Sequence, residues 1–249
     1  LADSGVERSA LVGAGVGIPG PIDRRTGTVA QGAILPEWVG INILQRLEEA
    51  LDLPVWVDND ANLGALSEVT WGPHTGISNL LFLKIGSGIG AGLILNGMPY
   101  YGNVGITGEI GHATIHEHGL VCRCGNRGCL ERYLSLDAFE RRGLPAEEWV
   151  AEVAPFFRSA VRIIENLFDP ETIVLGGLAP HAFIGHLATL VDGLDNSVSA
   201  RTHRVLPRVV VASDCHHSAL RGAAALAVFG VLSPRHGQMF EPSEKGTAE

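Results

Sequence analysis

The sequence predicts an α/β fold, and three observations support this prediction. Apolar runs of strand length alternate with longer segments of helical character along the chain. One such segment, 41–51, has apolar residues at helical spacing, and glycine-rich loops follow several of the strand-like runs. In folds of this kind, ligands bind where strand ends and glycine-rich loops converge, so we expect a functional site there.

The expected elements of the first half of the chain are, in order, a strand that runs into a Pro/Gly loop (11–23), a helix (41–51), a short buried strand (54–57), a helix (61–69), and a glycine-rich hairpin with strands at 79–85 and 91–97. Those of the second half are a mainly helical stretch (135–168), a strand with a Gly-Gly turn and the start of a helix (172–180), a strand (208–213), and a helix of small residues (218–232). We expect the polar tail after Pro234 to be frayed.

Composition and charge exclude several classes of protein. The chain has 249 residues, 46% hydrophobic and 18% charged, which is typical of a globular protein of one large domain or two small lobes. Its net charge of −9 argues against nucleic-acid binding by this chain alone, since phosphate neutralisation needs clustered cations. No apolar run is long enough to span a membrane, and no signal peptide is visible, so we expect a cytoplasmic location.

Three cysteines crowd into eight residues and predict a metal site. Cys122, Cys124 and Cys129 have the spacing C-x-C-x4-C, and His112 lies ten residues upstream. Three thiolates and one imidazole are a common ligand set for structural zinc. Gly125 and Gly128 allow the tight turns that such a knuckle needs. The alternative is three reduced core cysteines without a metal.

Three other residues of the same chemistry leave alternatives open. His116 and His118 compete with His112 as the fourth ligand, and we prefer His112 because a turn after "GEIG" would place it beside Glu109. Cys215, in "DCHHS", is interpreted as a buried free thiol rather than as part of a second metal site.

Carboxylates on both sides of the cysteines predict a site for a polyhydroxylated ligand. Glu109 and Glu131 flank the knuckle, which would fix both in space, and each ligand hydroxyl needs an acceptor. "DNDAN", at a strand end, adds Asn59 to orient a hydroxyl and Asp60 as a general base. The alternative for "DNDAN" is that it caps the N-terminus of a helix. The alternative for Glu109 and Glu131 is that they are ordinary surface residues.

The glycine-rich segment "IGSGIGAG" carries Gly86, Gly88, Gly90 and Gly92. A strand rather than a helix follows it, which excludes a dinucleotide fingerprint, and the absence of Gly-Lys-Ser/Thr excludes a P-loop. A glycine-rich hairpin can still present backbone N–H groups to a phosphate, although an ordinary tight hairpin has the same sequence.

Together these motifs resemble the ROK family (repressor, open reading frame, kinase) of sugar kinases and sugar-responsive regulators. The resemblance runs from about residue 11 to 232 and rests on "VDNDANLGALSE", "KIGSGIGAGLILNG", "GEIGH" and "CRCGNRGCLE". It implies an actin/hexokinase-like (ribonuclease H-like) fold of two lobes. We expect the smaller lobe to comprise 1–66 and 216–249, and the larger lobe 67–215.

The resemblance also implies roles for particular residues. Asp60 would be the catalytic base, a structural zinc would be held by His112 and the three cysteines, and Gly86, Gly88, Gly90, Gly176 and Gly177 would face a nucleotide. The groups expected to hold the sugar hydroxyls, of a hexose or an N-acetylhexosamine, are Asn59, Asp60, Glu109, His112 and Glu131. The family resemblance further suggests a homodimer or homotetramer.

One departure from the family pattern separates two functions. The family's kinases begin with a β-meander carrying D-x-G-G-T, which cradles the ATP phosphates, and neither this motif nor an initial Met is found here. We therefore expect a fragment or a processed product, which does not phosphorylate sugar at a useful rate. "GCLE" also looks more like the regulators than the "GCWE" of many glucokinases. We favour the effector domain of a repressor whose DNA contacts need an upstream helix-turn-helix. The alternative is a glucokinase-like enzyme that uses Mg-ATP.

Overall fold

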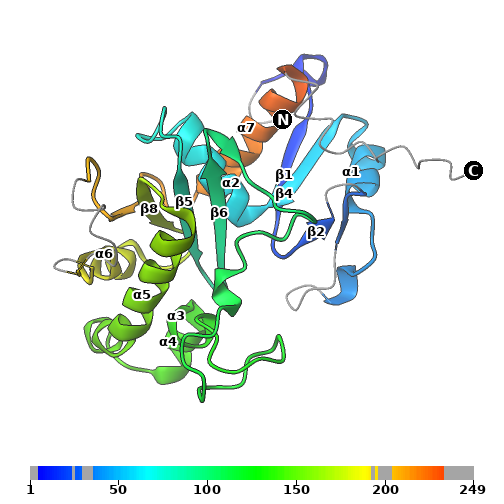
Figure 1. The fold of residues 1–249 in the computed structure, drawn as a ribbon. Coiled ribbons are helices and arrows are strands. Elements are labelled where there is room, and N and C mark those ends of the chain that lie inside the picture. The colour runs from blue at the N-terminus through cyan, green and yellow to red at the C-terminus, as the bar shows by residue number, and fades with distance from the viewer. Residues whose placement is uncertain (1–4, 24–25, 30–35, 192–193, 196–203, 233–249) are drawn as a thin grey trace, which may run out of the picture.

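A computed structural model describes residues 5–23, 26–29, 36–191, 194–195 and 204–232. The fold is mixed α/β, as the sequence predicts, with the strands gathered in the middle of the molecule and the helices around them (Figure 1). The N-terminal segments and the C-terminal helix lie on the same side of the molecule, next to each other.

The main sheet has five strands in the order β7-β6-β5-β8-β9. Strands β5, β8 and β9 are parallel to one another, whereas β6 and β7 continue the sheet as antiparallel hairpins. The strand bounds are β5 (Leu80–Ile85), β6 (Ile89–Leu95), β7 (Met98–Pro99), β8 (Thr172–Gly176) and β9 (Val209–Val211). Every residue of β8 is buried, as expected for a central parallel strand covered on both faces.

Helices cover this sheet. α5 (Ala146–Phe168) contributes a buried stripe that includes Phe157, Ala160 and Ile164 to the same hydrophobic core as the strands. α6 (His181–Thr189) packs beside α5, and the short helices α3 (Glu131–Leu134) and α4 (Leu136–Arg142) lie at one end of the sheet (Figure 1).

A second, smaller sheet pairs β1 (Ala14–Ile18) in parallel with β4 (Val55–Asn59). α1 (Ile43–Leu51), whose N-cap Asn42 accepts a hydrogen bond from the backbone of Gln45, packs on β4 and closes a separate hydrophobic cluster. The remaining elements of this part and of the later turns are short: β2 (Ile22–Asp23), β3 (Thr28–Val29), η1 (Arg8–Ala10), η2 (Pro36–Trp38) and η3 (Ile110–His112).

Two helices, α2 (Asp60–Thr70) and α7 (Ser218–Leu232), lie between the sheets, and α2 is the more deeply buried of the two. α2 contacts β5 and β6 on one side and α7 on the other. The approach is close because glycines meet backbone: a Cβ on Gly222 would lie 1.8 Å from the Leu63 carbonyl oxygen, and a Cβ on Gly15 would lie 1.8 Å from the Ala223 carbonyl oxygen. The small-residue helix predicted at 218–232 is therefore confirmed, together with the reason for its small residues.

The structure agrees with two of these predictions and adds detail to them. The stretch 135–168 is mainly helical, as predicted, and Gly143, which takes a left-handed conformation with φ 62°, divides it into α4 and α5. The strand predicted within 11–23 ends at Ile18, where "PGP" begins the predicted Pro/Gly loop. The division into two lobes stays a prediction, and the tail after Pro234 lies outside the described residues. None of the described helices is both long and apolar enough to cross a bilayer.

Candidate functional site

A cavity of about 860 Å³ lies between the end of β4, the β5–β6 hairpin and the cysteine-rich loop. Ligand pockets commonly have volumes of about 300–1,000 Å³. All five residues predicted to bind sugar are among its lining residues: Asn59, Asp60, Glu109, His112 and Glu131. The residues that were predicted together from the sequence lie in three separate segments of the chain, and the fold places them around one cavity.

The junction of β4 and α2 supplies the first two of these residues. Asn59 is the N-cap of α2, with its side-chain oxygen accepting from the Ala61 N–H at 2.8 Å and its amide donating to the Gly20 carbonyl at 3.1 Å. The capping role that the sequence offered as an alternative thus falls to Asn59. Asp60, in the first turn, turns its carboxylate toward the cavity.

Lys84, on β5, is a lining residue that the sequence analysis did not assign. Its ammonium donates a hydrogen bond to the Asp60 carboxylate, and the two side chains are about one-fifth exposed. A signal for it was present, because Lys84 is the single charge in the apolar run "NLLFLKIG" and a charge in such a strand needs a partner.

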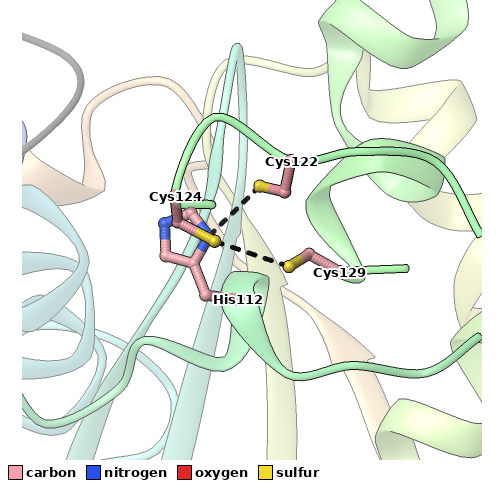
Figure 2. Close-up of side chains that lie close together, drawn as sticks. All are labelled: His112, Cys122, Cys124 and Cys129. Carbon is pink, nitrogen blue, oxygen red and sulfur yellow. Dashed lines mark hydrogen bonds between the residues drawn. The ribbon is translucent and has the colours of Figure 1, made fainter. Parts of the chain in front are cut away.

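The cysteine-rich loop brings four potential metal ligands together (Figure 2). The donor atoms of His112, Cys122, Cys124 and Cys129 lie within 4.8 Å of one another. The Cys122 sulfur is 3.6 Å from His112 Nδ1, and the Cys124 and Cys129 sulfurs are 3.7 Å apart. Ligands around tetrahedral zinc, with bonds of about 2.0–2.3 Å, lie about 3.5–3.8 Å from one another, so the observed spacing fits.

The thiols of this cluster oppose one another's ionisation, and a bound cation would relieve that repulsion. Burial raises the pKa of the Cys129 thiol to about 12, and the neighbouring thiols of Cys124 and Cys122 add to the rise. Such thiols become stable thiolates when a metal ion replaces their protons. Bound there, a zinc ion would supply cross-linking rather than chemistry, because all four positions of a tetrahedron are taken by protein.

The loop around these ligands is shaped by its glycines and by one tyrosine. Gly125 and Gly128 have φ values of 94° and 68°, as the predicted tight turns require, and a Cβ on Gly128 would meet the His116 carbonyl oxygen at 1.7 Å. The Tyr133 hydroxyl accepts from the Leu120 N–H at 3.0 Å and contacts His116 Nδ1 at 3.2 Å. His116 thus supports the loop, and the preference for His112 as the fourth ligand agrees with the geometry.

His112 faces the metal cluster with one nitrogen and the cavity with the other. Its Nε2 lies 3.8 Å from a carboxylate oxygen of Glu109. Burial in the cavity wall raises the pKa of Glu109, with His112 and Arg123 opposing the rise and Glu131 and Asp60 adding to it. Its side chain is nevertheless 44% exposed, because it faces the open cleft.

Glu131 is held by two donors. Arg123 Nη2 contacts both of its carboxylate oxygens, at 3.0 and 3.2 Å, and the Ile89 N–H donates at 3.1 Å. Gly88 leaves room for this carboxylate, since a Cβ there would lie 2.7 Å from Glu131 Oε2 and the carboxylate would have to shift. Arg123 is the second cationic lining residue that the sequence analysis missed, and its position between two cysteines of the cluster was the available signal.

The glycines expected to face a nucleotide fall into two groups. Gly88 and Gly90 line the cavity, whereas Gly86, Gly176 and Gly177 are not among its lining residues. The need for glycine at the last two positions has a structural explanation. A Cβ on Gly176 would meet the Phe82 ring at 2.4 Å, and Gly177 has a φ of 112°, which favours glycine. Their nucleotide contacts stay a prediction.

Cys215 lies apart from the knuckle. It is 5% exposed, and its thiol contacts the Ala212 carbonyl oxygen at 3.6 Å. Within the described part of the chain, the four residues of the knuckle are the one group arranged to hold a metal, which agrees with the interpretation of Cys215 as a buried free thiol.

Comparison with known proteins identifies the family of the chain. The ROK family model matches residues 3–150. The chain belongs to the ROK family. A ROK hexokinase from Thermus thermophilus superposes with a TM-score of 0.71 at 29% identity, covering 89% of this chain and 80% of that one. The actin/hexokinase-like fold expected from the resemblance is thereby confirmed.

The family includes both repressors and kinases. A xylose repressor from Caldicellulosiruptor bescii is 31% identical over 211 residues, which are 71% of this chain and 52% of the repressor. A glucokinase from Halalkalibacterium halodurans is 42% identical over 206 residues, 68% of this chain and 62% of the glucokinase. The chain thus spans between about half and two-thirds of the length of these curated relatives.

Proposed function

We propose that the cavity binds a hexose or an N-acetylhexosamine, and that the chain is the cytoplasmic sugar-sensing part of a ROK-type repressor. The observation that supports this most is that the five predicted residues, from three segments of the chain, line one cavity, to whose wall the four-donor cluster contributes His112 and Cys124. Carboxylates, an amide and an imidazole around an open cleft offer the acceptors and donors that sugar hydroxyls need.

The proposed metal is zinc, held by His112, Cys122, Cys124 and Cys129, with a structural role. It would fix the spacing between Glu109 and Glu131, which lie on either side of the knuckle in the sequence. In this proposal the protein's own side chains bind and orient the sugar, and the signal would reach DNA through a separate helix-turn-helix domain.

Asp60 by itself does not separate a sensor from an enzyme. One of its carboxylate oxygens accepts from Lys84, and a carboxylate that lines the cavity could hold a sugar hydroxyl in a sensor or deprotonate it in a kinase. A base contributes only about 10²–10⁴-fold, and most of the rate of phosphoryl transfer comes from positioning the phosphates. The described residues contain no loop that matches D-x-G-G-T.

The second candidate is an ATP-dependent, glucokinase-like hexose kinase, which the 42% identity to a glucokinase supports. A coupled ADP-release assay with a panel of hexoses and Mg-ATP, run beside calorimetry, separates the two. We expect sugar binding without turnover. Turnover of about 1–10³ per second that disappears in Asp60→Ala would make the chain a kinase. The absence of both binding and turnover would overturn both functions.

A further inference from the structure

Two cationic side chains that sequence reasoning did not assign share the cavity with the predicted sugar ligands. Lys84 enters from β5 and Arg123 from the cysteine-rich loop. Each is bound to a carboxylate of the cavity, Lys84 to Asp60 and Arg123 to Glu131. The cavity is therefore lined by ion pairs and not by carboxylates alone.

Each cation keeps donors for a ligand. The Lys84 ammonium has three N–H donors, of which Asp60 takes one, and its side chain remains 19% exposed within the cavity wall. Arg123 uses one terminal nitrogen on Glu131 and is 38% exposed, whereas Glu131 itself is only 9% exposed. Of this pair, the guanidinium of Arg123 is therefore the more accessible to a ligand.

His112 and Glu109 form a third, looser pair, since His112 Nε2 lies 3.8 Å from a carboxylate oxygen of Glu109. The cavity lining thus contains three pairs of a nitrogen-bearing side chain and a carboxylate. A sugar hydroxyl donates one hydrogen bond and accepts up to two, so it can give its proton to the carboxylate of a pair and accept from the cation. A phosphate dianion can accept from the remaining donors of a cation, but it has no proton to give to the neighbouring carboxylate, and the two negative charges repel each other. Asp23 adds one more carboxylate to the lining, which further disfavours an anion.

We propose that Lys84 and Arg123 contact the sugar directly, each as donor to a hydroxyl whose proton is accepted by Asp60 or Glu131. Their pairing makes the cavity selective for uncharged, polyhydroxylated sugars over phosphorylated ones. This inference rests on the proposed function, because it presumes that the cavity binds sugar.

The test is calorimetry with D-glucose, D-mannose, D-xylose and N-acetyl-D-glucosamine, followed by the phosphate ester of the tightest binder. Lys84→Met and Arg123→Met are each expected to weaken that sugar roughly 10- to 150-fold, the effect of losing a hydrogen bond to a charged group. Arg127→Met is the matched control, because Arg127 belongs to the same loop but donates to the Gly119 carbonyl outside the cavity lining. It should leave affinity unchanged, and the phosphate ester should bind at least about 10-fold more weakly than the free sugar.

Monodeoxy analogues of the same sugar separate direct contact from mere support of the carboxylates. In wild type, removal of the hydroxyl bound by Arg123 costs affinity, whereas in Arg123→Met the same removal should cost much less. Lys84→Met should show this coupling for a different hydroxyl. The melting temperature and metal content of each variant show whether it folds. If a methionine variant does not fold, Lys84→Arg and Arg123→Lys are measured in its place.

The failures are distinguishable. If wild type binds sugar but both cation variants bind it equally well, or if no hydroxyl shows coupling, Lys84 and Arg123 are not contacts and the proposed function stands without them. If the phosphate ester binds more tightly than the free sugar, the cations form an anion subsite and the selectivity argument is wrong. If no sugar binds at all, this inference fails together with the proposed function.

Discussion

The two walls of the cavity are built by different physics. The packed wall, defined as Asn59, Asp60 and Lys84, lies on β4, α2 and β5, where nearly all of α2 is buried between the main sheet and α7. The knuckle wall, defined as Glu109, His112, Arg123 and Glu131, lies on turns and short helices around the four side chains that could hold a metal ion. The first wall is held by apolar packing of regular elements, whereas the second has little regular structure of its own.

The difference indicates that each wall depends on a different support. Tight backbone packing fixes α2 without any ligand, so the packed wall should keep its shape when metal is removed. The knuckle wall is supported by its glycine turns and the Tyr133 contacts. In our proposal, a metal ion bound to the four-donor cluster also fixes the distances between its charged side chains. Four predictions break or sharpen this comparison, from the largest expected effect to the smallest.

Gly222→Ala should disrupt the packed wall most severely. Its Cβ would lie 1.8 Å from the Leu63 carbonyl oxygen, and neither helix backbone can move without separating α2 from α7. We expect a loss of at least about 3 kcal/mol in the free energy of unfolding, measured by urea denaturation. Gly185→Ala in α6 is the control, since nothing lies within 4 Å of its Cβ and stability should rise by up to about 1 kcal/mol. Equal stabilities for the two variants would contradict the packing argument.

Removal of the metal should disable the knuckle wall alone. Chelation, or Cys129→Ser, is expected to lower sugar affinity at least about 100-fold, because several charge-assisted hydrogen bonds of about 1.5 kcal/mol or more lose their geometry together. The helical circular dichroism signal should stay, because α2, α5 and α7 belong to the packed parts. Cys215→Ser, at a buried cysteine outside the cluster, should retain one zinc per chain by elemental analysis. If the metal-free protein binds sugar with unchanged affinity, the metal has no role in shaping the sugar site.

Glu131→Gln should weaken sugar binding without unfolding the protein. The change removes a charge from the pair with Arg123, and we expect a roughly 10- to 150-fold loss of affinity by calorimetry. Glu117→Gln serves as the control, because Glu117 is exposed on the same segment and does not line the cavity. If Glu131→Gln binds sugar as tightly as Glu117→Gln, Glu131 does not belong to the binding residues.

Cys215 should show the smallest effect, visible only at high pH. Burial raises the pKa of its thiol, and the carboxylates of Glu68 and Asp214 add to the rise. In the unfolded chain the Cys215 thiol loses its proton above about pH 8.5, whereas in the folded protein it keeps the proton to a higher pH. The free energy of unfolding should therefore fall as the pH rises further. Denaturation at pH 7.5 and 9.5 should show a smaller decline for Cys215→Ala than for wild type. An identical decline would mean that the thiol titrates normally.

Much of the fold and the group of four potential metal ligands could be predicted, because the sequence signals for them are local. The hairpin, the helix at 218–232 and the C-x-C-x4-C spacing each specify their structure within about fifteen residues. The sugar ligands of the two walls came from the family resemblance, and their assembly into one cavity agrees with it. Gly143 was missed as a helix break because apolar periodicity continues on both sides of it.

The cation pairs could not be predicted in the same way. Lys84 and Asp60 are 24 residues apart, and only the packing of β5 beside α2 brings them into contact. Arg123 and Glu131 are close in sequence, but spacing alone does not determine which way an arginine in a metal loop will point. In both cases a charge in an unexpected setting indicated that a partner exists, although not which one.

His112 has one ring nitrogen in each of the two proposed sites, Nδ1 among the sulfurs and Nε2 toward Glu109 in the cavity. Two binding equilibria that share a side chain are thermodynamically linked, and the linkage is reciprocal. A sugar that fixes the orientation of this imidazole must strengthen metal retention by the same factor by which the metal strengthens sugar binding. The response of the protein to sugar would then depend on the supply of metal, and measurement of either affinity requires that the other ligand be held constant.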